Sequence, residues 1–163
     1  MINLRTTPLD ADAFRPFGEV IETDNASEIR LINKGTTTRF HDIAPVDVAA
    51  GGGHPLISIF RGKPFDFPVT IEMMERHPLG SQAFMPLSAR PYLVVVAPDE
   101  GGKPGEPVVF LAAPDQGVSY HPNVWHHPLL SLEDVSDFLV VDRGGEGRNL
   151  EEADYETPFA VTD

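Results

Sequence analysis

The sequence predicts an all-β domain, an antiparallel barrel or jelly roll with one or two short helices. About a dozen short strand-like runs follow one another along the chain. Turn residues separate them, and the chain has 16 prolines and 14 glycines. No amphipathic helix longer than about two turns can be drawn. With 163 residues, the chain is long enough to form a single domain, 1–163, with a sizeable hydrophobic core.

The first third of the chain is expected to contain a helix and several short strands. An opening strand is expected at residues 4–8. Asp10 can cap one or two helical turns over 10–14, and Pro16 and Gly18 then end them. Further strands are expected at residues 19–22, 29–33 and 36–41.

The chain becomes more strongly β from Leu56 onward. The run 94–96, VVV, is typical of a strand buried on both faces. After Gly144 the sequence is rich in Gly, Glu and Asp, so we expect a mobile acidic tail from about residue 145. Strands are expected at 56–61, 67–74, 82–86, 92–97, 108–112 and 137–142.

Composition excludes several classes of function. There is no cysteine, so disulfides, thiolate metal sites and cysteine nucleophiles are excluded. The formal net charge of −13 argues against binding to nucleic acid or to an anionic membrane surface. The N-terminus lacks the apolar run of a signal peptide, and no stretch is long enough to span a bilayer. We therefore expect a soluble cytoplasmic protein.

A histidine-rich stretch, GVSYHPNVWHHP at 117–128, is the first candidate for a functional site. It holds three of the six histidines and the only tryptophan. Strand-forming residues flank the turn residues Pro122 and Asn123, which predicts two short extended pieces joined by a tight bend. Histidine is both a common metal ligand and a general base near neutral pH. The alternative is a hairpin in a β-rich core with histidines at its rim.

The second candidate is the stretch ERHPLGSQAFMP at 75–86. Glu75 and His77 lie two residues apart, so a strand would place both side chains on one face. Gln82 follows a Pro-Leu-Gly turn and can fold back toward them. Such nitrogen and oxygen donors suit Ni²⁺, Mn²⁺, Fe²⁺ or Zn²⁺. The alternative is a surface turn with one solvated histidine.

Together, the two stretches resemble the two metal-binding motifs of the cupin superfamily. In the first motif Glu75 stands in place of the first histidine and Gln82 in place of the glutamate. In the second motif, which begins at Pro122, His127 occupies the family's histidine position. The phrases ERHPLGSQAFMPL, GVSYHPNVWHHPL and DFLVVDRGG, together with the opening FRPFGEVIE, resemble those of ureidoglycolate lyases over nearly the full length.

The resemblance implies a double-stranded β-helix that usually forms a homodimer. It also implies an enzyme that splits ureidoglycolate into glyoxylate and urea in allantoin and purine breakdown, and nickel is the metal associated with some members. Two other functions are considered. One is a different cupin enzyme that acts on a small hydroxy acid, and the other is a non-catalytic cupin that binds glyoxylate.

The resemblance and the chemistry of the reaction suggest roles for the candidate residues. Elimination of urea requires a base for the C2 hydroxyl and an acid for the departing nitrogen. The motifs imply a divalent metal, with nickel favoured, at Glu75, His77, Gln82 and His127. Since neighbours in a regular strand face opposite ways, only one of His126 and His127 should enter the barrel. The acid–base candidates are His121, His126 and Tyr120.

A small anionic substrate also needs a cationic partner. A bidentate arginine suits a carboxylate, and the candidates are Arg76, Arg61 and Arg39. Arg143 is a weaker candidate because it can pair with Asp142 or stabilise a turn.

Overall fold

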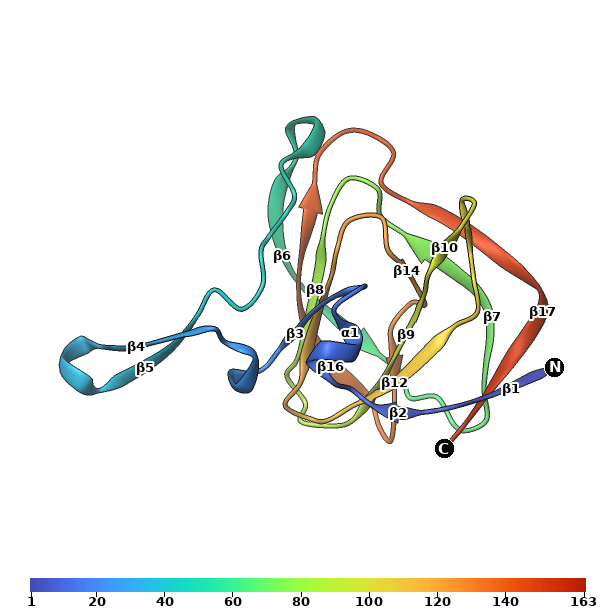
Figure 1. Ribbon diagram of the computed structural model, residues 1–163, viewed down its shortest axis with the longest axis horizontal. Helices are drawn as coiled ribbons and strands as arrows, with labels where there is room; N and C mark the ends of the chain where they lie inside the picture. Colours follow the sequence, from blue (N-terminus) through green and yellow to red (C-terminus); the bar gives the residue numbers. More distant parts are fainter.

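The computed structural model describes all residues 1–163 and is nearly all β (Figure 1). Two large sheets face each other, as expected for a cupin-type double-stranded β-helix. The eight-stranded sheet has the order β1-β17-β7-β14-β9-β12-β2, and β15 also pairs with β9. Its strands are β1 (Ile2–Arg5), β17 (Glu151–Thr162), β7 (Val69–Arg76), β14 (Trp125–His126), β9 (Tyr92–Ala97), β12 (Val108–Ala112), β2 (Thr7–Pro8) and β15 (Leu130–Ser131).

The five-stranded sheet has the order β3-β13-β8-β16-β6. Its strands are β3 (Gly18–Ile21), β13 (Gly117–Tyr120), β8 (Gln82–Pro86), β16 (Ser136–Gly144) and β6 (His54–Gly62). Two small antiparallel pairs lie outside the barrel. They are β4 (Glu28–Ile32) with β5 (Thr37–His41), and β10 (Asp99–Glu100) with β11 (Lys103–Pro104).

Strand β9 is buried on both faces, as its apolar sequence predicts. On one face Tyr92, Val94 and Val96 belong to the core between the two large sheets. The alternate residues Leu93 and Val95 belong to a second core, which β7, β17 and β12 enclose. The barrel wall is therefore packed from both sides, which makes β9 a rigid support for whatever lies beside it.

One short α-helix and three 3₁₀ turns complete the chain. The α-helix, α1 (Ala11–Phe14), lies where the sequence predicts it, and Asp10 caps it by accepting a hydrogen bond from the Ala13 backbone N–H at 2.9 Å. Phe14 is fully buried against the rings of Phe110 and Tyr120. None of the helices has the length and apolar character needed to cross a bilayer. The 3₁₀ turns are η1 (Thr23–Asn25), η2 (Asn33–Gly35) and η3 (Ala50–Gly52).

The expected mobile tail contains a long strand instead. β17 pairs antiparallel with β7 and parallel with β1, and so joins the end of the chain to the barrel. The cause is an alternation hidden by the acidic composition, because Ala153, Tyr155, Phe159 and Val161 pack on the second core. The acidic residues between them take outward positions.

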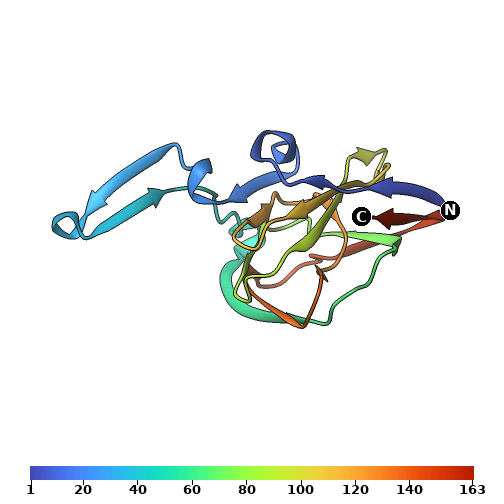
Figure 2. The ribbon, with the colours of Figure 1, turned by 90° about the horizontal axis from the view of Figure 1, so that it is seen from below.

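The β4–β5 hairpin projects away from the barrel (Figures 1 and 2). We call residues 28–41 the arm. Ile32 and His41 are half-buried, Phe40 is 36% exposed, and the other residues of the two strands are exposed. The arm therefore has no hydrophobic core of its own beneath it.

Candidate active site and metal centre

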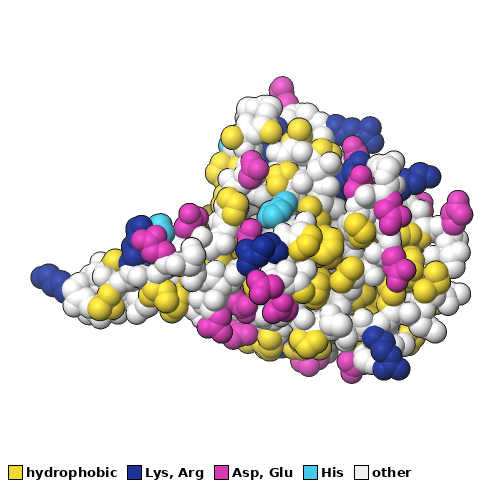
Figure 3. All heavy atoms as spheres, viewed as in Figure 1, with side chains coloured by type: hydrophobic (Ala, Val, Ile, Leu, Met, Phe, Trp, Pro, Cys, Tyr) yellow, Lys and Arg dark blue, Asp and Glu magenta, His cyan; other side chains and the backbone are white.

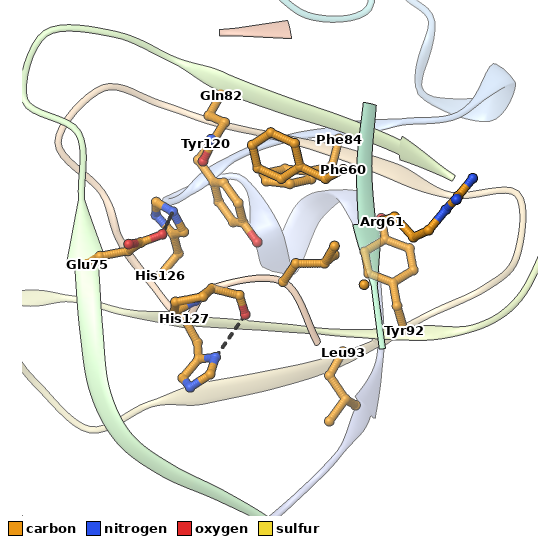
Figure 4. A pocket seen from close by; sticks show the side chains of 13 residues that line it. Phe60, Arg61, Glu75, Gln82, Phe84, Tyr92, Leu93, Tyr120, His126 and His127 are labelled. Atoms are coloured by element: carbon orange, nitrogen blue, oxygen red, sulfur yellow. Dashed lines mark hydrogen bonds and ion pairs between the residues drawn. The ribbon is translucent and has the colours of Figure 1, made fainter. Parts of the chain in front are cut away.

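A pocket of about 360 Å³ opens into the barrel between the two large sheets (Figure 4). This volume lies at the lower end of the range for small-molecule sites. Aromatic and aliphatic side chains, including Phe60, Phe84 and Leu129, form much of its wall. The polar groups gather at one end, which is therefore where chemistry is to be sought.

Three potential metal ligands meet beside this end of the pocket, where Glu75 and His126 line the cavity and His77 lies next to them. Glu75 in β7 lies directly opposite His126 in β14, so the two side chains emerge on the same side of the sheet. His77 follows β7 and projects beside them. Glu75 Oε1 lies 3.6 Å from His126 Nε2 and 3.9 Å from His77 Nε2. The three ligand atoms all lie within 4.8 Å of one another.

The hydrogen bonds of the two imidazoles leave both Nε2 atoms free to bind a cation. His77 Nδ1 donates to the Asn149 carbonyl at 2.8 Å, and His126 Nδ1 donates to the Val124 carbonyl at 3.0 Å. A carbonyl only accepts, so each Nδ1 carries the proton of the neutral ring. Both Nε2 atoms are buried and have no hydrogen-bond partner. This arrangement, in which a carbonyl orients each histidine ligand, fits a divalent metal.

Gln82 supplies a further oxygen at the same end of the pocket. Its Nε2 donates to Asp142 Oδ2 at 3.1 Å, which fixes the orientation of the amide. Its Oε1 is buried without a partner. A buried acceptor in this state is costly unless something binds it. Gln82 is thus suited to join Glu75, His77 and His126 around one ion.

The structure differs from the motif-based prediction at His127. Its ring points away from Glu75 and His126 (Figure 4), and its Nδ1 donates to the Pro128 carbonyl at 2.8 Å. Adjacent residues in an extended chain face opposite sides, and His126 takes the inward position. Burial lowers the pKa of His127 below its ordinary value, so this ring is neutral at pH 7. His127 contributes to the pocket wall, outside the cluster of metal donors.

Tyr120 lies against the metal-binding end. Its ring stacks on His126 with a centroid distance of 4.3 Å and an interplanar angle of 11°. The hydroxyl projects into the middle of the pocket (Figure 4). Burial, and secondly the charge of Glu75, raise the pKa of Tyr120 above its ordinary value. Tyr120 therefore keeps its proton at neutral pH and can donate a hydrogen bond to a bound molecule.

The Glu75 carboxyl is ionised although it is partly buried. Burial acts to raise its pKa, but the interaction with His126, followed by the charges of His77 and His127, lowers the pKa overall. Glu75 is therefore ionised at neutral pH. A charged carboxylate between two imidazole lone pairs again fits a cation site.

His121, proposed above as an acid–base group, lies outside the pocket. It follows β13, and its Nε2 lies 3.3 Å from Glu19 Oε1. Its side chain is 40% exposed, and it does not line the cavity. The Pro122–Asn123 turn directs it to the surface, away from the donors. The structure therefore does not bring His121 together with the other candidates.

The position of Arg76 also differs from the prediction. It donates to Glu151 Oε2 at 2.7 Å and to Asp99 Oδ1 at 2.9 Å, and its guanidinium lies 4.3 Å from the centre of the Trp125 ring. These contacts place it on the outside of the barrel. Arg76 lies between Glu75 and His77, so the alternation that turns those two inward turns Arg76 outward.

Of the three predicted arginines, Arg61 is the one that lines the pocket. It lies at the end of β6, and its guanidinium points away from Glu75 (Figure 4). It forms a two-pronged ion pair with Asp137, at 2.8 and 3.1 Å. The third candidate, Arg39, is in the arm opposite Arg30, far from the pocket. Arg143 has a structural role, since it donates to the Ala50 and Glu146 carbonyls.

Sequence reasoning missed the group that orients His77. Asn149 accepts from His77 through its carbonyl and from the Leu79 N–H through its side chain, the latter at 2.8 Å. It lies in the segment expected to be a mobile tail. A lone asparagine among acidic residues carries no signal of this role in the sequence. The long-range pairing of β17 with β7 brings it to the site.

Comparisons with known proteins show the family of this chain. A family model described as ureidoglycolate lyase matches residues 1–162. The ureidoglycolate lyase of Rhizobium etli (strain CIAT 652) is 61% identical over 154 residues, which cover 94% of this chain and 92% of that protein. Ureidoglycolate lyase 1 of Rhizobium meliloti (strain 1021) is 57% identical over 160 residues, 98% of this chain and 94% of that protein. This chain belongs to the ureidoglycolate lyase family.

Proposed function

We propose that this protein is an enzyme that splits ureidoglycolate into glyoxylate and urea, in the breakdown of allantoin and purines. The observation that carries the proposal is the cluster of Glu75, His77 and His126, of which Glu75 and His126 line the polar end of a small pocket. The match to the family over residues 1–162 supports the same activity. The pocket has the size for a small polar acid and the groups that its elimination requires.

The reaction breaks the C–N bond of a hemiaminal and converts its C2 hydroxyl into a carbonyl. The hydroxyl proton must go to a base, and the departing urea nitrogen must receive one. We assign the base to Glu75, which is ionised and has a second oxygen besides the one that faces the imidazoles. We assign the proton donor to the Tyr120 hydroxyl, because its raised pKa keeps it protonated and it projects into the cavity.

The proposed metal site consists of Glu75, His77 and His126, with Gln82 as a fourth donor. A divalent cation bound there would supply Lewis acidity that lowers the pKa of the substrate hydroxyl. Nickel is favoured by the family resemblance, and mixed nitrogen and oxygen donors suit it. The carbonyls that accept from both Nδ1 atoms hold the imidazoles in the tautomer that such a site requires.

The remaining pocket residues bind and enclose the substrate. The apolar wall that includes Phe60, Phe84 and Leu129 limits the access of water to the polar end. Arg61 at the mouth is the proposed partner of the substrate carboxylate. On binding, this carboxylate would replace Asp137 in the ion pair with the Arg61 guanidinium. The further elements of the proposal are a cytoplasmic location and a homodimer.

The proposal is tested by incubating the purified, nickel-supplemented protein with ureidoglycolate and measuring urea and glyoxylate. Both products should form in equal amounts and well above the spontaneous rate. Equal rates with and without protein would contradict the proposed activity. A panel of other small hydroxy acids, assayed alongside, tests the specificity for ureidoglycolate.

A further inference from the structure

On the side of the sheet that faces away from the pocket, a second pair of residues lies behind the metal donors. Glu75 in β7 lies opposite His126 in β14, and the antiparallel register then sets Arg76 opposite Trp125. Neighbouring residues of a strand face opposite sides, so this second pair points away from the pocket. The Arg76 guanidinium lies 4.3 Å from the centre of the Trp125 ring. The two strands that carry the donors are therefore in side-chain contact on both faces.

Asp99, at the start of β10, connects the two outer side chains. Its Oδ1 accepts from Arg76 Nη1 and from Trp125 Nε1, each at 2.9 Å. The hydrogen bond from Trp125 is the largest of the effects that lower the pKa of Asp99, so this carboxylate is ionised at neutral pH. Its Oδ2 accepts from the Gly102 N–H at 3.3 Å. One carboxylate oxygen thus binds a residue of β7 and a residue of β14 at the same time.

Glu151, at the start of β17, holds Arg76 from a second direction. It faces Arg76 in the register of β7 and β17, and its Oε2 accepts from Arg76 Nε at 2.7 Å. The Arg76 side chain is 12% exposed, so its charge is largely covered by these partners. Figure 3 shows basic and acidic side chains close together over the region of β10 and β17. A planar guanidinium suits this place, since it can stack on a ring and donate in two directions. We call Arg76, Trp125, Asp99 and Glu151 the outer clamp.

β14 is too short to fix its position against β7 by backbone pairing alone. It has two residues, and only His126 pairs with β7. A tight turn precedes it, in which Asn123 has a positive φ of 66°. Pro128, which has no N–H to donate, follows soon after it. A strand with so few ladder hydrogen bonds depends on side-chain contacts for its register, and the outer clamp supplies them.

Each of the three metal donors is a chain neighbour of a clamp residue. Arg76 lies between Glu75 and His77, and Trp125 directly precedes His126. A functional metal site requires its donors to be held within about 0.5 Å of the productive geometry. A shift of β7 against β14 would move Glu75 and His126 apart by the same amount. The contacts that prevent this shift on the outer face therefore control the donors on the inner face.

We infer that the outer clamp positions the metal donors, and that Arg76, Trp125 and Asp99 are positioning residues that act without touching the ion or the substrate. The inference rests on the metal site proposed above and extends it to the opposite face of the sheet. It also gives a role to a largely buried arginine that the pocket does not use.

Isothermal titration calorimetry with nickel chloride tests the clamp on the metal-free protein. Arg76→Met and Asp99→Ala should each weaken nickel binding by about 10-fold to 100-fold, as is usual for residues behind metal ligands. Charge alone predicts the opposite sign for Arg76→Met, because the loss of a nearby cation favours binding of another. Arg90→Met is the matched control, since Arg90 also joins two segments, through the Val135 carbonyl and Asp134, and does not line the pocket. Wild-type affinity in either clamp variant would overturn the inference.

Nuclear magnetic resonance of the histidine rings gives a second readout, which needs neither nickel nor substrate. In metal-free Arg76→Met and Asp99→Ala, the ring signals of His77 and His126 should move, whereas those of His54, at the start of β6, should stay as in the wild type. A role in stability alone would lower the unfolding temperature, measured by circular dichroism, and leave all ring signals of the folded protein unchanged. That result would also overturn the inference.

The two measurements keep the clamp separate from the proposed function. A wild-type protein that binds no nickel would contradict the proposed metal site, and the ring signals would still decide whether the clamp positions His77 and His126. Neither measurement uses ureidoglycolate, so the outcome is independent of whether the protein splits it.

Discussion

The metal-binding end of the pocket, which we call the deep end, differs from its mouth in how the polar side chains are held. At the deep end each of these side chains makes a hydrogen bond to a further group, whereas at the mouth Arg61 is 74% exposed and paired with Asp137 alone. His77 and His126 each donate to a backbone carbonyl, and Gln82 donates to Asp142. The deep end is built from β7, β8 and β14, which other strands flank on both sides. The mouth includes the end of the edge strand β6.

The difference indicates a division of tasks. Groups that must hold an ion or move a proton need fixed geometry, and the deep end provides it. A group that binds an incoming substrate and changes its ion-pair partner needs access to solvent, and the exposed Arg61 side chain has that access. Substitutions at the deep end should therefore lower kcat strongly, and substitutions at the mouth should act mainly on KM.

The largest effect is expected at the donors. His77→Ala and Glu75→Gln should each lower urea release by about 10² to 10⁴-fold, because each removes a metal donor and Glu75 is also the proposed base. Urea release is measured with nickel present, and circular dichroism checks the fold. His121→Ala is the control and should retain near wild-type activity, since His121 lies outside the pocket. Wild-type turnover in His77→Ala would exclude its role.

A smaller loss is expected at Tyr120. Tyr120→Phe keeps the ring that stacks on His126 and removes only the hydroxyl, so kcat should fall about 10²-fold with KM nearly unchanged. Steady-state kinetics separate the two constants. If KM rose instead and kcat stayed constant, the hydroxyl would serve in binding and not in proton transfer.

The next largest effect is expected at Asn149, whose backbone carbonyl orients the His77 ring. Asn149→Ala removes the acceptor of the Leu79 N–H and loosens the segment whose carbonyl orients His77. Nickel affinity should fall about 10-fold to 100-fold, as is usual when a residue behind a metal ligand is changed. Isothermal titration calorimetry measures this directly. Unchanged affinity would show that the backbone contact holds without the side chain.

The smallest effect is expected at the mouth. Arg61→Ala should raise KM about tenfold or less with little change in kcat, because the exposed guanidinium binds the substrate weakly. Asp137→Asn is its partner control. It releases Arg61 from its ion pair and should leave KM unchanged or lower it. A large fall in kcat in Arg61→Ala would place this arginine in the chemistry and remove the contrast between the two ends.

Much of this fold follows from local patterns. The buried β9, the capped helix at Asp10 and the shared face of Glu75 and His77 were all predictable, because each depends on spacing along one segment. The same alternation already excludes Arg76 from the pocket. Short-range rules are therefore reliable here wherever they are applied to every residue of a strand.

Features set by distant segments could not be predicted in this way. The inward position of His126, and not His127, depends on its register opposite Glu75 across β7 and β14. The role of Asn149 depends on the pairing of β17 with β7.

Metal content measured in two neighbouring variants tests the proposed site most directly. Wild type, His126→Ala and His127→Ala are loaded with nickel, freed of excess metal and subjected to elemental analysis. The geometry predicts that the wild type and His127→Ala retain about one nickel per chain and that His126→Ala loses it. Retention of nickel by His126→Ala together with its loss from His127→Ala would contradict the site described here.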